Sequence, residues 1–165
     1  MKPSVYIETT VISYLTARPS RDLIVAAHQQ ITNDWWEKRR TDYDVFVSEF
    51  VLKEANKGDK KAAQKRMEIL SKISLLKVDD EITQLGISFI RNGHLPKKAT
   101  EDALHIAIAT VHQMDYLVTW NCKHIANAQI YKTLRNIAAA NNYELPIICT
   151  PEELLGEFYE KHTTR

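Results

Sequence analysis

The segment Ser4-Val5-Tyr6-Ile7-Glu8-Thr9-Thr10 joins a short apolar run to an acid and two hydroxyl side chains. Its β-branched and aromatic residues favour a buried strand over residues 4–7. Similar runs predict strands over residues 44–47, 74–78, 116–119 and 146–149. Stretches with apolar residues at helical spacing separate these runs. The alternation predicts a three-layer α/β fold, in which a parallel sheet of about five strands carries helices on both faces.

Capping residues and helix breakers set the bounds of the expected helices. A glycine ends two of them, and a proline begins the last. The expected helices cover residues 21–40 after Ser20, 49–57 after Ser48, 60–73 after Asp59, 80–92 before Gly93, 101–111 after Thr100, 128–141, and a short segment from Pro151.

The composition bounds the class of protein. The 165 residues are 44% hydrophobic and 26% charged, with only 4 Gly and 5 Pro, which is typical of a folded globule. We expect one domain over residues 1–160 and a flexible tail over residues 161–165. The net charge of +1, from 22 basic and 21 acidic residues, excludes a global basic field, so any nucleic-acid contact needs a local patch.

Two cysteines are too few for a disulfide framework or a zinc site. The sequence has no apolar stretch near the ~18 residues of a membrane span, and its first residues do not have the pattern of a signal peptide. We therefore expect no membrane contact and a location in the reducing cytoplasm.

Four polar side chains stand at equivalent places in the predicted sheet. Glu8 follows the first strand, and Glu54 lies on the helix after the second. Asp102 starts the helix that leads into the fourth strand, and Asn121 follows that strand. Ligands of open α/β sheets bind beyond the carboxyl ends of the strands, so the four can meet at one edge. Mg²⁺ and Mn²⁺ prefer such oxygen ligands, and phosphodiester hydrolysis uses such an ion.

Each acid also has an ordinary structural interpretation. Glu8 can be a solvated cap at the end of its strand. Glu54 can lie on an exposed helix face, and Glu49 is its rival on the same predicted helix. Asp102 can be a first-turn acid that favours the helix dipole, and it competes with Glu101 for the inward direction.

Hydroxyl and lysine side chains near the acids are candidates for substrate contact. Thr9, Thr10 and Thr119 can position an attacking water or hold a phosphate oxygen, or they can be caps and strand-end hydrogen bonds. Lys53 and Lys57 open a basic run that can grip a phosphate backbone, with a solvated surface as the alternative. The run consists of Lys53, Lys57, Lys60, Lys61, Lys65 and Arg66.

Aromatic and histidine residues add two expectations. His105 lies among apolar residues of its predicted helix, so we interpret it as a core or edge histidine rather than a ligand. Trp35 and Trp36 are adjacent on another predicted helix. Neighbouring residues point ~100° apart there, so only one of the two can reach the core.

Together these segments resemble the PIN domain, a family of Mg²⁺- or Mn²⁺-dependent ribonucleases with a Rossmann-like fold. Within this family the chain resembles the toxin half of VapBC-type toxin–antitoxin pairs. The resemblance covers roughly residues 4–127. The segments that carry it are Glu8-Thr9-Thr10, Glu54 four residues before Gly58, Asp102 five residues before Ala107, and Thr119-Trp120-Asn121. Glu8 stands where such proteins usually carry Asp, and Asn121 offers an oxygen without the negative charge.

The resemblance implies an endoribonuclease with Glu8, Glu54, Asp102 and Asn121 as its catalytic set. Glu8, Glu54 and Asp102 would hold Mg²⁺ or Mn²⁺, directly or through waters, and Asn121 would be an auxiliary ligand or orient a water. RNA would be the substrate, an antitoxin the partner, and a homodimer the assembly. The alternatives are a catalytically silent PIN-like module that binds RNA or protein, and a DNA structure-specific nuclease of related fold.

Overall fold

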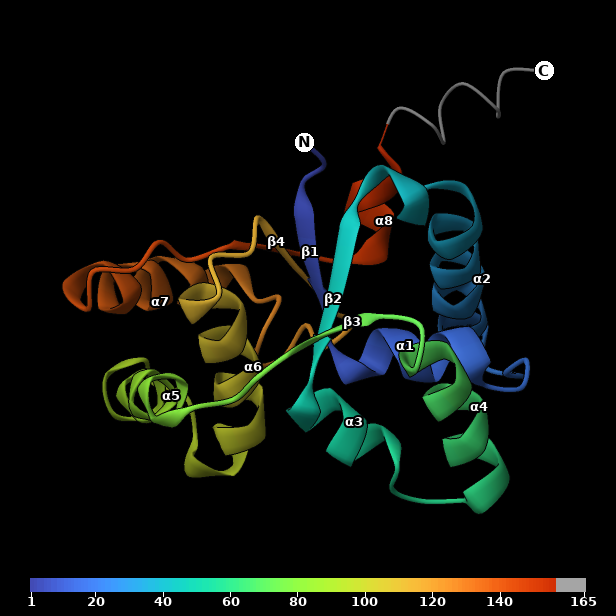
Figure 1. The fold of residues 1–165 in the computed structure, drawn as a ribbon, viewed down its shortest axis with the longest axis horizontal. Helices are drawn as coiled ribbons and strands as arrows, with labels where there is room; N and C mark the ends of the chain where they lie inside the picture. The colour runs from blue at the N-terminus through green and yellow to red at the C-terminus, as the bar shows by residue number, and fades with distance from the viewer. Residues whose placement is uncertain (157–165) are drawn as a thin grey trace.

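The computed structural model describes residues 1–156, which form a central sheet covered by helices on both faces (Figure 1). Its strands are all parallel and lie in the order β3-β2-β1-β4-β5. The predicted α/β fold with five parallel strands is therefore confirmed. The strands are β1 (Ser4–Ile7), β2 (Asp44–Ser48), β3 (Ser74–Leu76), β4 (Tyr116–Val118) and β5 (Ile147–Cys149).

The helices divide between the two faces of the sheet, which confirms the three layers. Helices α5, α6 and α7 lie on one side, and α1, α2, α4 and α8 lie on the other (Figure 1). The helices are α1 (Thr9–Thr16), α2 (Leu23–Lys38), α3 (Glu49–Ala55), α4 (Lys60–Leu70), α5 (Asp80–Asn92), α6 (Thr100–Val111), α7 (Ala128–Ala140) and α8 (Pro151–Leu155), with short 3-10 turns η1 (Arg40–Asp42) and η2 (Lys97–Ala99).

Three helix starts differ from the expectation. Helix α1 was not predicted, and its N-cap is Glu8, whose carboxylate accepts a hydrogen bond from the Thr10 amide. Helix α2 is capped by Asp22 rather than Ser20, because the Asp22 carboxylate accepts from two free amides of the first turn. Thr100 does not cap α6: it is the first helical residue, and its hydroxyl donates to the Lys97 carbonyl of the preceding 3-10 turn.

The core surrounds the two central strands. Val5, Tyr6 and Ile7 of β1 and Leu117 and Val118 of β4 are fully buried. The chain runs outward from β1 through β2 to β3 and then returns to β4 on the other side of β1. The gap between the carboxyl ends of β1 and β4 is therefore the topological switch point, where α/β proteins bind their ligands.

The expectation for the two tryptophans is met, and the expected domain end lies beyond the described residues. Trp35 is fully buried and Trp36 is only partly buried, as the helical geometry predicts. In the part of the chain that the structure describes, no helix has the length and apolar character needed to cross a membrane. The predicted domain end at residue 160 and the predicted tail over residues 161–165 lie outside residues 1–156.

Candidate metal centre

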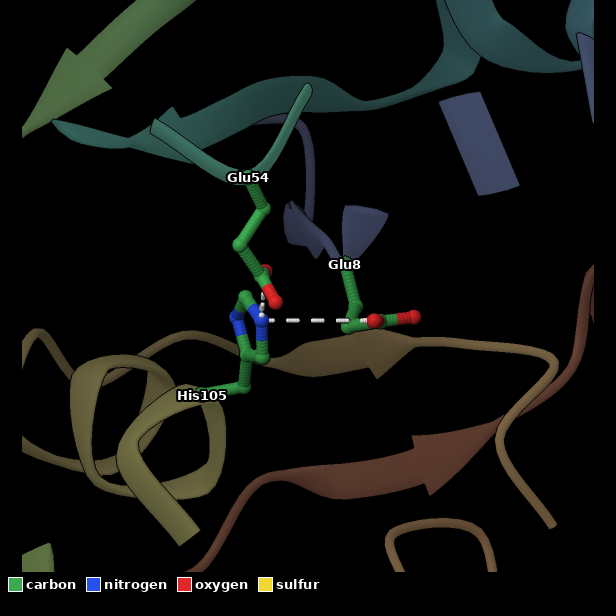
Figure 2. A group of neighbouring side chains, drawn as sticks. All are labelled: Glu8, Glu54 and His105. Carbon is green, nitrogen blue, oxygen red and sulfur yellow. Dashed lines mark hydrogen bonds and ion pairs between the residues drawn. The ribbon is translucent and has the colours of Figure 1, made fainter. Parts of the chain in front are cut away.

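Two acids and a histidine converge at the switch point. Figure 2 shows Glu8 at the end of β1, Glu54 on α3 and His105 on α6 pointing toward one another. One ligand atom from each lies within 4.8 Å of the other two. We call these three residues the acid–histidine group. Glu8 and His105 are 4% and 1% exposed, so the group lies inside the protein with Glu54 toward its opening.

Hydroxyl groups hold the Glu8 carboxylate in one orientation. Its Oε2 accepts hydrogen bonds from the Thr10 amide at 3.0 Å, from the Thr10 hydroxyl, and from the Thr119 hydroxyl at 2.8 Å. Its Oε1 faces His105 Nε2 at 4.0 Å. Three donors on one oxygen satisfy the hydrogen-bonding capacity of this buried carboxylate and fix its orientation.

The Glu54 carboxylate is held by two donors of its own. Its Oε1 accepts from the Thr9 hydroxyl at 2.6 Å and lies 2.5 Å from His105 Nε2. Burial raises the pKa of Glu54, but the hydrogen bond and charge of His105, the Thr9 hydroxyl and the charge of Lys57 outweigh it and lower this pKa. Glu54 is therefore an anion at neutral pH.

A chain of hydrogen bonds fixes the orientation of the His105 ring. The Val51 amide donates to Ser48 Oγ at 3.2 Å, and Ser48 Oγ lies 2.8 Å from the Tyr6 hydroxyl. That hydroxyl lies 2.8 Å from His105 Nδ1. Burial raises the pKa of Tyr6 well above its usual value, so Tyr6 stays a phenol that bridges Ser48 and His105 Nδ1. Because the Glu54 carboxylate can only accept, the Nε2–H of His105 donates to it.

Asp102 and Asn121 form a second group with His124. Asp102 Oδ1 accepts from the Asn121 side-chain amide at 2.9 Å, and Asp102 Oδ2 lies 2.8 Å from His124 Nδ1. Asn121 Oδ1 accepts the His124 amide at 3.0 Å. The backbone amide of Asn121 donates to the Thr119 hydroxyl, which in turn donates to the Glu8 carboxylate. The two groups are therefore adjacent and connected through one threonine.

The structure brings together some of the predicted site residues and separates their rivals from them. Glu8 and Glu54 meet in the acid–histidine group, whereas Asp102 and Asn121 pair beside it. Glu49 is exposed and faces the Val78 amide at 3.5 Å. Glu101 is 60% exposed and lies 3.8 Å from Lys57 Nζ. Neither rival belongs to the group.

His105 is the residue that the sequence interpretation missed. It is buried, as expected of a core histidine, but its Nε2 faces both glutamates. A signal was present, because His105 follows Asp102 by three residues and therefore lies one turn further along the same face of α6. A helix that points an acid toward the sheet edge points such a histidine the same way.

The threonines contact the acids, and the lysines lie on the surface. The hydroxyls of Thr9, Thr10 and Thr119 donate to Glu54 or Glu8, which matches the interpretation of these residues as strand-end hydrogen-bond donors. Lys53 is exposed, and Lys57 is 60% exposed beside Glu101. Contact of these five residues with substrate stays a prediction.

The donor set suits a hard divalent cation. Glu8 Oε1 and the Glu54 carboxylate offer oxygen ligands within 4.8 Å of each other, and the Nε2–H of His105 is donated to Glu54. Carboxylate oxygens with waters suit Mg²⁺ and Mn²⁺, whereas sites with several imidazole nitrogens suit other transition metals. The acid–histidine group can therefore hold one such ion.

The protein has a parallel α/β fold with an acidic group at its switch point, and its likeness to known proteins rests on this fold rather than on its sequence. No family model and no curated protein matches the sequence. Solved structures of bacterial toxins do match the fold. VapC20 of Mycobacterium tuberculosis, described as a sarcin-ricin loop cleaving toxin, matches with a TM-score of 0.58 and 15% identity over 73% of this chain and 92% of its own.

Two toxin–antitoxin structures match equally well. A toxin–antitoxin complex from Klebsiella pneumoniae has a TM-score of 0.56 and 20% identity over 76% of this chain and 92% of its own. VapBC2 from Rickettsia felis, bound to a DNA fragment from its promoter, has a TM-score of 0.57. It is 17% identical over 88% of this chain and 97% of its own. The chain therefore has the PIN-like fold of VapC toxins, as the sequence resemblance predicts.

Proposed function

We propose that the protein is a Mg²⁺- or Mn²⁺-dependent endoribonuclease of the PIN-domain type and the toxin of a VapBC-like pair. The observation that carries this proposal is the convergence of Glu8 and Glu54 with His105 at the switch point. The toxin structures of the same fold support it. A group of buried acids is costly without a cation, because like charges repel and burial disfavours their ionised forms.

In this proposal the acids, Asn121 and the threonines have different roles at the metal site. When bound, the ion supplies Lewis-acid polarisation of the phosphoryl group and neutralises charge at the leaving oxygen. Glu8 and Glu54 would hold the ion, and Asp102 would complete the set directly or through a water. The Asn121 side-chain amide donates to the Asp102 carboxylate and would orient a water. Thr9 donates to the Glu54 carboxylate, and Thr10 and Thr119 donate to that of Glu8, so the two carboxylates are directed at the same point.

The same proposal names the partners and the setting. The substrate is single-stranded RNA, and the restraining partner is an antitoxin, as in the toxin–antitoxin complexes that share the fold. The active assembly is a homodimer, and the protein acts in the cytoplasm.

Two variants on α3 test the enzyme proposal. Glu54→Gln keeps the shape of a side chain in the acid–histidine group and removes its charge, whereas Glu49→Gln makes the same change at an exposed position. With Mn²⁺ present, Glu54→Gln should cleave single-stranded RNA about 10- to 100-fold more slowly. Glu49→Gln should match the wild type, and a chelator should abolish cleavage by both. Equal rates for Glu54→Gln and wild type would contradict the proposal.

A second candidate is a catalytically silent module that binds RNA. It is favoured by Asn121, whose amide group contacts Asp102 where a further carboxylate would strengthen cation binding. This candidate predicts that RNA is bound but stays intact at every concentration of Mg²⁺ or Mn²⁺. Cleavage that depends on the metal and on Glu54 would exclude it.

A further inference from the structure

A cleft with a strong positive charge lies at the other end of α1 from the candidate metal centre. It has a volume of about 810 Å³ and lies between the C-terminal end of α1 and the N-terminal half of α4. Five of its lining residues are cationic, and Asp59 is its one acid. We call it the basic cleft, and its cations are Arg18, Lys60, Lys61, Lys65 and Arg66. This imbalance contrasts with the nearly neutral chain, whose net charge is +1.

Within the described part of the chain, no ion pair neutralises the cations of the basic cleft. Asp59 is the N-cap of α4, and its carboxylate accepts the Ala62 amide at 2.9 Å. Within residues 1–156, no carboxylate forms a salt bridge with Arg18, Lys60, Lys61 or Lys65. All four of these side chains are exposed. Such an arrangement attracts an anion.

Arg66 connects the basic cleft to the acid–histidine group. Its Nε donates to the Ala55 carbonyl at 2.8 Å, and its guanidinium also donates to the Lys57 carbonyl at 2.7 Å. Ala55 follows Glu54 at the end of α3. The Arg66 side chain therefore links the cleft to the backbone next to a candidate metal ligand. The relative positions of the two sites are therefore fixed.

Helix α1 sets the distance between the two sites. Glu8 caps its N-terminus, and Ser13, Thr16 and Ala17 at its other end line the cleft. Figure 1 shows α4 beside α1 on the same side of the sheet. A helix of 8 residues is ~12 Å long, so the two sites lie within a few nucleotides of each other along one strand.

We propose that the basic cleft binds the phosphate backbone of the RNA strand a few nucleotides from the phosphodiester at the acid–histidine group. This proposal rests on the proposed function and adds the path of the substrate to it. The lining contains no aromatic ring, so bases have no platform for stacking there. Lysine and arginine contacts to phosphate position a strand without reading its sequence. The cleft therefore contributes affinity and register rather than sequence specificity.

Binding without cleavage provides the first test. Single-stranded RNA is titrated in chelator against the wild type, Lys61→Ser/Lys65→Ser, and the control Lys72→Ser/Lys132→Ser. The control removes the same charge from exposed lysines that do not line the cleft. The cleft variant should bind about 10-fold more weakly, and its salt slope should fall by about 1.4 if each lysine contacts one phosphate. The control should match the wild type, and Lys61→Arg/Lys65→Arg should keep wild-type affinity.

Cleavage kinetics and an acidic peptide separate the remaining outcomes. With Mn²⁺, the cleft variant should raise KM for long RNA and keep kcat. Lysine-dependent RNA binding without any cleavage would support the cleft and defeat the nuclease proposal. Metal-dependent cleavage with equal RNA binding by the cleft and control variants would overturn the cleft proposal and leave the nuclease proposal standing. Lysine-dependent binding of poly-glutamate, with no loss of RNA affinity, would assign the cleft to an acidic protein segment and also overturn it.

Discussion

At the scale of single residues, the candidate metal centre is a set of carboxylates whose directions are fixed by neighbouring hydroxyls. Glu8 uses Oε2 for hydrogen bonds to Thr10 and Thr119, so Oε1 faces the interior of the group. Glu54 is fixed by Thr9 and by His105, whose own ring is held by Tyr6. Such fixed supporting groups keep the carboxylates in the orientation that an ion needs.

Asn121→Asp tests how near this residue lies to the ion. The change places a second carboxylate 2.9 Å from Asp102 Oδ1, where the amide now donates a hydrogen bond. In chelator the variant should be less stable by about 1–3 kcal/mol, because a hydrogen bond is lost and like charges repel. Addition of Mn²⁺ should raise the Tm of the variant by more than it raises the Tm of the wild type. Equal Mn²⁺-induced shifts in Tm, measured by thermal denaturation, would place residue 121 outside the ion's reach.

At the scale of elements, short helices and strand ends bring the residues of the centre to one edge of the sheet. Strand positions could be predicted well, because β-branched runs are a local property of the sequence. Helix α1 could not, because its N-cap is an unusual glutamate and it follows β1 without a connecting loop. The start of α6 was also misassigned, since a 3-10 turn with its own hydrogen bond precedes it.

Two glycines, Gly86 within α5 and Gly93 at its C-terminal end, test the packing of this helix against its neighbours. A Cβ at Gly86 would meet Ala107 and Leu104 of α6 at 3.8 Å, which is ordinary contact. Gly86→Ala should therefore stabilise the protein by up to ~1 kcal/mol through helix propensity. A Cβ at Gly93 would overlap the Phe89 carbonyl, so Gly93→Ala should destabilise by about 1–3 kcal/mol. Denaturant unfolding measures the free energy of unfolding of both variants. A loss of stability in Gly86→Ala would show that α5 and α6 pack more tightly than these 3.8 Å contacts indicate.

At the scale of the whole molecule, the reversal of strand order at β1 places the site. Because β2 and β4 lie on opposite sides of β1, the segments that follow β1, β2 and β4 open onto one edge. Glu8, Glu54 and Thr119 come from those segments. His105 reaches the same edge from α6, which covers one face of the sheet (Figure 1). The centre is therefore assembled from segments far apart in the chain.

The two cysteines report on the integrity of this fold. Cys122 is exposed, whereas Cys149 on β5 is 3% exposed. Burial and the charge of Glu153 raise the pKa of Cys149 to about 12. Since the thiolate is the reactive form, iodoacetamide at pH 8 should modify Cys122 and leave Cys149 intact. Cys149 should react only when the core opens, and Cys122→Ser should show no early labelling by mass spectrometry. Early modification of Cys149 would contradict the β5 position.

The fold class and the acids that follow the strands could be predicted from the amino-acid sequence, because hydrophobic periodicity and capping chemistry act over a few residues. Glu8 and Glu54 could be predicted as partners on that basis. The three-dimensional packing was needed to show that His105 faces both acids and that Asp102 pairs with Asn121 and His124. It was also needed to place the basic cleft one helix length away. Those relations depend on helix rotation and on packing across the sheet, which no local pattern encodes.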